Sequence, residues 1–441
     1  MTDAEFVREI ARPLSGGPGD YGPLLELIGD ARFVLLGEAT HGTHEFYFER
    51  AMITKRLIAE KGFTVISIEA DWPDSSRVHR YVRGASDDTD PNEALSGFRR
   101  FPTWMWRNTV VVEFIEWLRD FNQHLDSKRA PTDFYGMDLY SLHASIDAVL
   151  GYLEKVDPDA AKRARGRYSC FDHFGREPQE YGYAATVGAI EPCEDEVVEQ
   201  LVELQRKGTE FLSRDGDVAV EELFFAEQNA RLVKNAEKYY RSMFRGRASS
   251  WNLRDQHMVE TIDALVAYFD GSRQPKTIVW AHNSHLGDAR ATEMSQHGEL
   301  NVGQLVRERF GSEAVLIGFS TNHGTVTAAS DWGARAERKR VRPALQGSYE
   351  KLFHETGLPR FWINLRDADK TIDVLHEPRL ERAIGVIYRP ETERLSHYFQ
   401  ARLLEQFDAV IHIDETHAVE PLERTSIWDE GELPETYPFQ V

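Results

Sequence analysis

The residues of this chain that could do chemistry are histidines and carboxylates that directly follow short apolar runs. The run at 33–36 is followed by Gly-Glu-Ala-Thr-His-Gly, which contains Glu38 and His41. Glu69 follows a run at 64–68, Asp138 follows Phe-Tyr-Gly-Met at 134–137, and His-Asn-Ser-His at 282–285 follows a run at 278–281. Such runs predict buried strands, and ligands bind beyond the carboxyl ends of strands in open α/β sheets. We therefore expect these side chains to meet at one edge of a sheet.

His41 is the candidate general base, because an unperturbed imidazole titrates near neutral pH. A base needs a partner that orients its ring, and Glu38 lies three residues earlier in a loop bounded by glycines. We expect the two side chains to act together.

A helix is predicted over residues 44–61, with Thr43 at its N-cap and Gly62 at its end. Arg50 falls on the same stripe as residues 46, 53 and 57, which should face the core. A charged side chain there is rare unless it is paired. We expect Arg50 to engage Glu38, Glu69 or a negative charge that develops in the site, with a structural ion pair as the alternative.

His282 and His285 are three residues apart and lie near one turn beyond a strand. We expect them to donate hydrogen bonds to a substrate carbonyl or leaving oxygen. Asp138 is expected either to bind substrate or to cap a helix. His44 is expected either to bind substrate or simply to begin the helix.

A metal site is the main alternative for the same residues. His41, His44, Glu69, His282 and His285 are ligand types that suit Zn²⁺ or Mn²⁺. The sequence has no His-Glu-x-x-His motif, and a cationic side chain beside the site would disfavour a divalent metal. We therefore expect no metal and no cofactor.

Covalent catalysis has less support in the sequence. No Gly-x-Ser-x-Gly motif follows a strand, and neither Cys170 nor Cys193 follows one. The two cysteines could form one disulfide, although nothing demands it, and so few cysteines fit a reducing cytoplasm. Glu38 and Glu69 could be the carboxylate pair of a glycosidase, and this alternative stays open because their separation is not encoded in the spacing.

The elements that would position these groups alternate between strands and helices. Strands are predicted at 33–36, 64–68, 133–135, 277–280, 314–317, 360–363, 383–387 and 409–413, and helices at 44–61 and 110–124. Continuous apolar runs indicate strands that are covered on both faces. We predict an α/β fold with a mostly parallel layered sheet flanked by helices.

Three segments of different character divide the chain. Residues 1–140 and 271–441 are the two parts of the α/β core, which carry the Gly-Glu-Ala-Thr-His-Gly and His-Asn-Ser-His motifs respectively. Residues 141–270 are charged, helical in pattern and poor in strand signals, so we predict a helical insertion beside the active-site cleft. A loop with a solvated basic run, 335–342, is expected within 325–342.

Composition restricts the partners. The chain has 441 residues and a formal net charge of −21, which argues against nucleic acid, because phosphate backbones require clustered Lys and Arg. No run approaches the length of a transmembrane span, and the N-terminus has no signal-peptide pattern. We expect a cytoplasmic enzyme that acts on a small molecule, with no membrane partner.

Taken together, the motifs resemble the signature of the erythromycin esterase family from about residue 24 to residue 421. The matching segments are Gly37 to Thr43 with Glu45, Phe46 and Arg50, then Ile68-Glu69-Ala70, Tyr135 to Asp138, Trp280 to His285, and Phe407 to Thr416. The resemblance implies an α/β fold with a helical subdomain and a metal-independent hydrolytic site. It also implies that His41 is the general base that activates water, with Glu38 and Glu69 to orient and polarise it, Arg50 and His282 to shape the site, and His285 in support.

The family reaction is the opening of the lactone of 14-membered macrolides such as erythromycin, which inactivates the antibiotic and gives resistance. Not every member hydrolyses macrolides, so the motif locates the chemistry better than it names the substrate. We expect direct attack of water on an ester carbonyl without a covalent intermediate, with Arg50 and His282 stabilising the oxyanion. The alternatives are a metal-dependent hydrolase that uses the same cluster, and a non-catalytic protein that binds glycans or macrocycles.

Overall fold

A computed structural model describes residues 2–17, 19–174, 178–215, 217–244, 246–270, 274–366 and 373–431. The strands are β1 (Arg12–Pro13), β2 (Phe33–Leu36), β3 (Val65–Asp71), β4 (Asp133–Asp138), β5 (Thr277–Trp280), β6 (Ala314–Ala328), β7 (Glu337–Val341), β8 (Arg360–Asn364), β9 (Arg379–Arg382), β10 (Tyr398–Ala401) and β11 (Ala409–Thr416). The longer helices are α1 (Asp3–Ile10), α2 (Gly22–Ile28), α3 (His44–Lys61), α4 (Trp72–Val82), α6 (Thr109–Gln123), α7 (Leu142–Val156), α8 (Pro158–Tyr168), α9 (Pro178–Thr186), α10 (Glu194–Asp215), α11 (Asp217–Ser242), α12 (Arg247–Asp270) and α14 (Val302–Phe310). Shorter helices are α5 (Pro91–Ala94), α13 (Asn283–Leu286), α15 (Tyr349–His354), α16 (Asp373–His376), α17 (Glu393–Ser396), α18 (Leu403–Gln406) and α19 (Ser426–Glu430).

The main sheet is mostly parallel, as predicted. Its strand order is β1-β8-β11-β6-β2-β5-β3-β4, and β7 pairs with β6 outside this path. The neighbours from β11 to β4 run parallel, whereas β8, β1 and β7 are antiparallel to their partners. The carboxyl ends of β2, β5, β3 and β4 therefore lie at one edge, which is where the candidate motifs begin.

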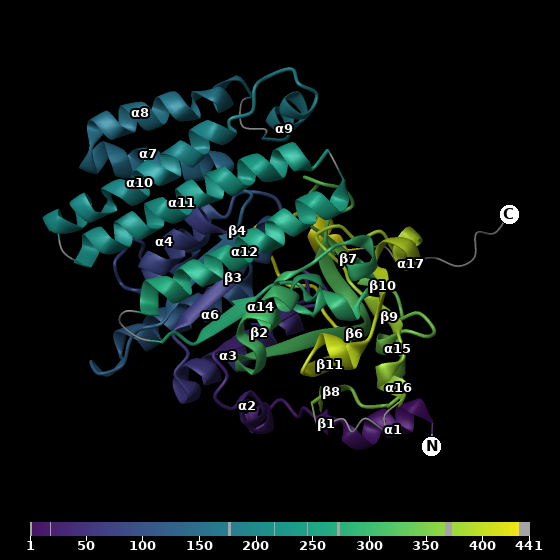
Figure 1. Cartoon of the computed structure of the whole chain (residues 1–441). Coiled ribbons are helices and arrows are strands. Elements are labelled where there is room, and N and C mark those ends of the chain that lie inside the picture. The colour runs from purple at the N-terminus through teal and green to yellow at the C-terminus, as the bar shows by residue number, and fades with distance from the viewer. Residues whose placement is uncertain are drawn as a thin grey trace.

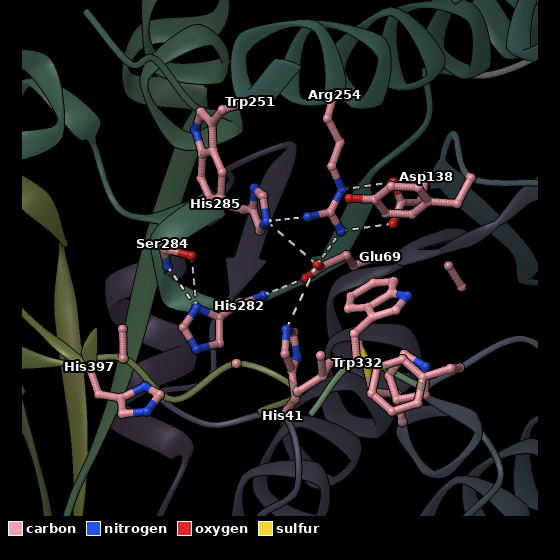
Figure 2. A pocket seen from close by; sticks show the side chains of 18 of the residues that line it. His41, Glu69, Asp138, Trp251, Arg254, His282, Ser284, His285, Trp332 and His397 are labelled. Carbon is pink, nitrogen blue, oxygen red and sulfur yellow. Dashed lines mark hydrogen bonds and ion pairs between the residues drawn. The ribbon is translucent and has the colours of Figure 1, made fainter. Parts of the chain in front are cut away.

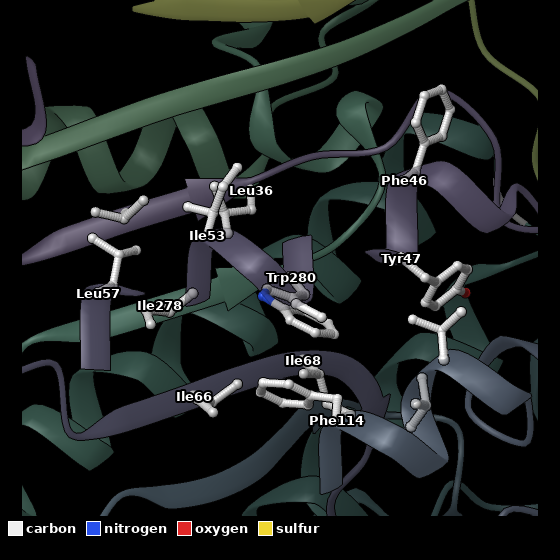
Figure 3. Packing of buried hydrophobic residues seen from close by; sticks show 14 of the residues in the cluster. Leu36, Phe46, Tyr47, Ile53, Leu57, Ile66, Ile68, Phe114, Ile278 and Trp280 are labelled. Atoms are coloured by element: carbon white, nitrogen blue, oxygen red, sulfur yellow. The ribbon is translucent and has the colours of Figure 1, made fainter. Parts of the chain in front are cut away.

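Alternating residues of each central strand contact different helical layers, because successive side chains in a strand point to opposite faces. In β2, Val34 and Leu36 pack in a cluster with α2, α3 and α6, whereas Phe33 and Leu35 pack with α12, α14 and α15. Figure 3 shows the first cluster, in which side chains of α3 and of the strands meet around Trp280. Burial on both faces explains why the strands read as continuous apolar runs.

Helix α3 begins and ends as predicted. Thr43 is its N-cap residue, although its side chain does not cap the helix, and Gly62 ends the helix in the left-handed conformation at φ 71°. Arg50 is buried on the core-facing stripe. Helix α6 also matches the predicted 110–124 to within one residue.

Helices α7 to α11 form a layer at one end of the molecule, beyond β4 (Figure 1). Their apolar cluster includes Trp72 and Tyr135 of the neighbouring α/β elements. A disulfide joins Cys170 to Cys193 in this layer, so the cysteines no longer favour a reducing compartment. None of the helices in the described ranges is long and apolar enough to cross a membrane.

Helix α12 closes the predicted insertion but packs in the core of the sheet. Met258, Val259 and Ile262 belong to the cluster that covers β2, β5 and β6. The helix leads toward β5, so it has the position of a crossover helix between β4 and β5. The division of the chain at 140 and 270 remains a prediction, with α12 contacting both the helical layer and the sheet.

Two predicted segments were wrong. Residues 383–387 do not form a strand of their own; they follow β9 and make only single parallel bridges, from Ile384 to Thr40 and from Ile387 to Ala329. The expected loop at 325–342 is a hairpin of β6 and β7, because Val326 and Lys339 pair in register. Alternation along β7 buries Lys339, whose Nζ donates to the backbone oxygen of Tyr388 at 3.1 Å.

The loop between β2 and α3 passes very close to β6 at Gly42, where a Cβ atom would lie 1.8 Å from the backbone oxygen of Thr327. We predict that Gly42→Ala lowers the free energy of unfolding by about 3–5 kcal/mol, the range of severe core defects. The control is Gly151→Ala in α7, where nothing lies within 4 Å of the new atom. This control should be neutral or stabilising by up to about 1 kcal/mol. Urea unfolding followed by circular dichroism measures both, and equal stability of the two variants would refute the close approach.

Candidate active site

A cavity of ≈ 450 Å³ lies at the carboxyl edge of the parallel strands. Five predicted residues line it, namely His41, Glu69, Asp138, His282 and His285 (Figure 2). Much of the remaining wall is aromatic, formed by Phe98, Phe101, Trp106, Tyr140, Trp251, Trp332, Tyr398 and Phe399. Apolar walls with a few convergent polar groups are typical of sites for small organic molecules.

Glu38 lies behind His41 and has a partner for each oxygen. Oε1 accepts a hydrogen bond from Nδ1 of His41 at 2.8 Å, and Oε2 lies 2.6 Å from Nη2 of Arg50. Arg50 is fully buried, with its guanidinium carbon 4.5 Å from the centre of the Tyr47 ring and 5.0 Å from that of Trp280. A buried carboxylate is costly unless a cation compensates it, and Arg50 supplies that cation.

The position of Arg50 corrects one expectation. Arg50 does pair with Glu38, as the helical stripe predicted, but it does not line the cavity. It therefore cannot contact an oxyanion there. Its charge reaches the site only through Glu38 and His41.

His41 presents a lone pair to the cavity. A carboxylate accepts hydrogen bonds only, so Nδ1 of His41 carries the proton that goes to Glu38 and Nε2 is left unprotonated in the neutral ring. Nε2 lies 3.9 Å from Oε1 of Glu69. This is too long for a direct hydrogen bond but suits a shared water molecule. An imidazole oriented by a carboxylate in this way can act as a general base.

Glu69 is buried opposite His41. Its Oε2 accepts the backbone N–H of His282 at 2.9 Å, and its Oε1 accepts Nη2 of Arg254 at 2.6 Å. Burial alone would raise the pKa of Glu69, but His285, Arg254 and His41 hold it well below its usual range. Glu69 is therefore a carboxylate at neutral pH and can accept a hydrogen bond from water.

Arg254 connects the strand ends to each other. It donates from Nε and Nη2 to the two oxygens of Asp138 at 2.9 and 2.8 Å, and from Nη2 also to Glu69. Asp138 is not a helix cap, because Ser141 is the N-cap residue of α7. Asp138 lines the cavity, yet both of its oxygens are occupied by Arg254, so its geometry favours a positioning role over direct contact with substrate.

His282 and His285 differ in what they offer to a substrate. Nδ1 of His282 faces only donors, the hydroxyl of Ser284 at 2.8 Å and its backbone N–H at 3.2 Å. The proton is therefore on Nε2, which is buried and has no hydrogen-bond partner among the described residues. Burial and the neighbouring His41 hold the pKa of His282 well below its usual range. His282 is thus a neutral donor, and it lies beside His41 with ring centres 4.8 Å apart.

His285, by contrast, has no free nitrogen. Nδ1 donates to Asp255 at 2.9 Å, and Nε2 accepts from Nη1 of Arg254 at 3.0 Å. Its ring stacks on Trp251 with a centroid distance of 4.4 Å and an interplanar angle of 7°. The expectation that His285 donates to substrate is therefore not supported; it positions Arg254.

His44 is not brought to the site. It does not line the cavity, and its ring stacks on Phe48 at 6.3 Å. Its backbone N–H donates to the carbonyl of His417 at 2.8 Å. As the first residue of α3 it is directed away from the strand ends, and a substrate-binding role has no support from its position.

Sequence reasoning missed Arg254, Asp255 and Trp251, because all three belong to α12, inside the segment read as an insertion without a motif. A signal was present. Arg254 lies four residues before Met258 and eleven before Leu265, on the helical stripe that carries these buried apolar side chains. This is the same reasoning that singled out Arg50.

Asn283 holds the two motif loops together. Its backbone N–H donates to the carbonyl of Glu38 at 2.8 Å, and its side chain exchanges hydrogen bonds with the backbone of Phe319 at 2.8 and 3.3 Å. A Cβ at Gly37 would lie 2.2 Å from Oδ1 of Asn283. Glycine is therefore required there for the loop of β2 to approach that of β5.

The donor set does not favour a metal ion. His285 has both nitrogens engaged, His282 accepts a hydrogen bond at Nδ1 and carries its proton on Nε2, and Glu69 is bound to Arg254. Within the described part of the chain, no group of three or more His, Cys, Asp or Glu side chains is arranged to hold a metal. A metal would have to displace a guanidinium from Glu69.

Comparisons with known proteins point to one family. A sequence model described as erythromycin esterase matches residues 58–416. YbfO of Bacillus subtilis (strain 168), named as a hydrolase, is 22% identical over 410 residues, covering 89% of this chain and 85% of that protein. The type II erythromycin esterase of Escherichia coli is 20% identical over 421 residues, which cover 91% of this chain and 93% of that protein.

Solved structures share the fold. A succinoglycan biosynthesis protein superposes with a TM-score of 0.74 at 23% identity, covering 95% of this chain and 97% of that one. A mutant of the erythromycin esterase EreC in its open conformation superposes with a TM-score of 0.69 at 16% identity, covering 92% and 96%. The α/β architecture with its helical layer is thus shared over nearly the whole length.

Glu381 of β9 is buried near Asn283, and burial together with Glu350 raises its pKa from 4.5 to about 8. Between these values the folded state holds one proton more than the unfolded state, so the free energy of unfolding should fall as the pH rises toward about 8. We predict that Glu381→Gln removes this pH-dependent fall in stability. Near pH 8, the Tm of the variant should exceed that of wild type by about 2–5 °C. Exposed Glu391→Gln is the control. Identical Tm-against-pH curves for wild type and Glu381→Gln, recorded by calorimetry, would show that Glu381 does not titrate in this range.

Proposed function

This chain belongs to the erythromycin esterase family and is a hydrolase of the esterase kind, and from that premise we propose that His41 is the general base with which it hydrolyses an ester or macrocyclic lactone. The observation that carries this proposal is the geometry of His41. Its Nδ1 is held by Glu38 at 2.8 Å, and its Nε2 is directed into the cavity, 3.9 Å from Glu69. A histidine with a merely structural role has no need of a free nitrogen beside a buried carboxylate.

In the proposed reaction, water binds between Nε2 of His41 and Oε1 of Glu69. Nε2 takes a proton from the water, whose oxygen attacks the carbonyl carbon of the ester. Glu38, compensated by Arg50, stabilises the imidazolium that forms. When the tetrahedral intermediate collapses, the carbon–oxygen bond to the alcohol breaks and His41 returns the proton to the leaving oxygen. No covalent enzyme intermediate is involved.

His282 is the proposed oxyanion donor. Its Nε2–H is buried beside His41, and Nε2 keeps this proton because Nδ1 is occupied by Ser284. A preorganised neutral donor is suited to the negative charge that develops on the carbonyl oxygen. Arg254 acts differently, since its donors are directed to Glu69, Asp138 and His285; it fixes the position of Glu69.

The proposed substrate class is an ester or lactone of drug size, such as the 14-membered lactone of erythromycin. A volume of ≈ 450 Å³ with an aromatic wall suits a largely apolar ring system. The similarity to the type II erythromycin esterase of Escherichia coli supports this choice, because it extends over 91% of this chain at 20% identity. Opening the lactone would inactivate the antibiotic, so a resistance role belongs to the same proposal.

Two alternatives from the sequence remain to be tested against this function. A metal-dependent hydrolase would use the same histidines and Glu69 as ligands. A non-catalytic protein that binds glycans or macrocycles would be stabilised by its ligand without turning it over. The base and its orienting carboxylate favour catalysis over binding alone.

We predict that His41→Ala lowers kcat for ester hydrolysis by about 10²–10⁴, because it removes the proton acceptor. Calorimetry should show a folded variant whose Tm is lowered by a few degrees at most, because Oε1 of the buried Glu38 loses its hydrogen-bond partner. The assay is mass-spectrometric detection of the +18 Da product from erythromycin and a panel of simple esters and lactones, where 18 Da is the mass of the added water. His44→Ala, three residues away and outside the cavity, is the matched control and should keep its kcat. Full kcat in His41→Ala would overturn the assignment.

We also predict that activity survives treatment with EDTA and gains nothing from added Zn²⁺ or Mn²⁺, because Arg254 already provides the cation beside Glu69. The measurement is the same product assay on dialysed enzyme, with metal content determined by atomic spectroscopy. Loss of activity on chelation, restored by Zn²⁺ or Mn²⁺, would establish the metal-dependent alternative instead.

A further inference from the structure

Two carboxylates in the wall of the cavity have no part in the proposed reaction. Asp71 is the last residue of β3 and the N-cap residue of α4, and Asp74 lies in the first turn of that helix. Both line the same cavity as His41 and Glu69. Asp71 follows Glu69 by two residues in the same strand, and Asp74 follows Asp71 in the first turn of α4.

Neither carboxylate is fully compensated. Oδ2 of Asp71 accepts from Nε of Arg100 at 2.9 Å, but Oδ1 is buried and has no hydrogen-bond partner in the described ranges. Asp71 as a whole is only 4% exposed. Asp74 makes no hydrogen bond or ion pair with any described residue, and burial together with the charge of Asp71 raises its pKa to about 7. A buried carboxylate oxygen without a donor is unusual in a folded protein.

The wall around this pair carries a surplus of negative charge. Glu69, Asp71, Asp74 and Asp138 line it with only Arg100 and Arg254 as guanidinium partners. Arg99 also lies near Asp74, but it is exposed and donates to the carbonyl of Ser96 at 3.0 Å. The other cation that lines the cavity, Arg247, pairs with Glu299 at 3.2 Å. A cation brought by the ligand would remove this imbalance.

Aromatic rings complete the surroundings of the pair. Phe98 and Trp106 line the same cavity, with their ring centres 6.3 Å apart. The position of a Cβ at Gly97, next to Phe98, lies 3.4 Å from Oδ1 of Asp74, so this ring comes from a segment that packs on Asp74. Aromatic faces attract cations in addition to providing apolar contact. Carboxylates beside aromatic rings form an environment suited to an alkylated ammonium group.

We propose that Asp71 and Asp74 form a subsite for a protonated amine of the substrate, so that the preferred esters or lactones carry a basic nitrogen. This inference rests on the proposed ester hydrolysis only in its kinetic test, because the binding test below does not require turnover. Asp74, which lines the cavity without a partner among the described residues, supplies the carboxylate that accepts the N–H of the ammonium, and the charge of Asp71 beside it adds to the negative potential. The amine then fixes the ester near His41.

The test compares two esters of the same shape, dimethylaminoethyl phenylacetate and isopentyl phenylacetate, at about pH 8, where most of Asp74 is ionised. Wild type should prefer the amine by about 10-fold or more in kcat/KM, mainly through KM, as expected for a charged hydrogen bond in a partly buried site. Asp74→Asn should reduce this preference ratio toward one. The matched control is Glu293→Gln, which removes a charge from another residue that lines the cavity; the ratio should stay close to that of wild type.

Three outcomes would overturn the subsite. The first is equal kcat/KM for the two esters in wild type, and the second is an unchanged preference ratio in Asp74→Asn. The third is an equal fall of the ratio in Asp74→Asn and Glu293→Gln, which would indicate a general electrostatic effect of the acidic cavity and no specific subsite. A binding measurement separates this inference from the proposed function. If neither ester is turned over, the esterase proposal fails, and calorimetric titration with benzyl dimethylaminoethyl ether decides the subsite alone. Binding to wild type that weakens about 10-fold in Asp74→Asn supports it, and undetectable or unchanged binding refutes it.

Discussion

The buried charge of Glu38 is the constraint on which the site depends. A carboxylate in the core requires compensation, and this chain compensates it on one side with Arg50 and uses the other oxygen to hold His41. The cation comes from α3, the helix that follows β2. Tyr47 and Trp280 pack around the guanidinium of this ion pair. The reactive nitrogen of the imidazole is left facing the cavity.

A second ionic centre, Arg254, does for Glu69 what Arg50 does for Glu38. Each carboxylate has its own arginine from its own helix, and the two pairs meet only across the 3.9 Å between Glu69 and His41. The arrangement keeps both carboxylates charged in a buried setting while leaving the base itself without a cation. Fixed charges on rigid elements are what a site requires if it is to favour a developing charge without reorganising.

Much of this could be predicted from the sequence, for identifiable reasons. The parallel strands and their polar ends were readable because burial on both faces gives unbroken apolar runs, and Arg50 was readable because a charge interrupts an apolar stripe. Three features were not. Arg254 lies far along the chain from Glu69, so no local spacing connects them. The separate roles of His282 and His285 depend on which of their nitrogens meet a donor. The hairpin at β6 and β7 hides its strand pattern among charged residues, one of which, Lys339, is buried.

Helix α12 has a consequence for how this fold can diversify. It carries Arg254 and Asp255 and then leads to β5, whose loop carries His282 and His285. Deleting or adding a single residue within α12, between Arg254 and the residues that pack on the sheet, would rotate the guanidinium by about 100° around the helix axis relative to them. A change of length in this part of α12 would therefore turn Arg254 away from Glu69. No described residue of α7 to α11 lines the cavity, so this outer layer can be remodelled while the hydrolytic apparatus is inherited unchanged.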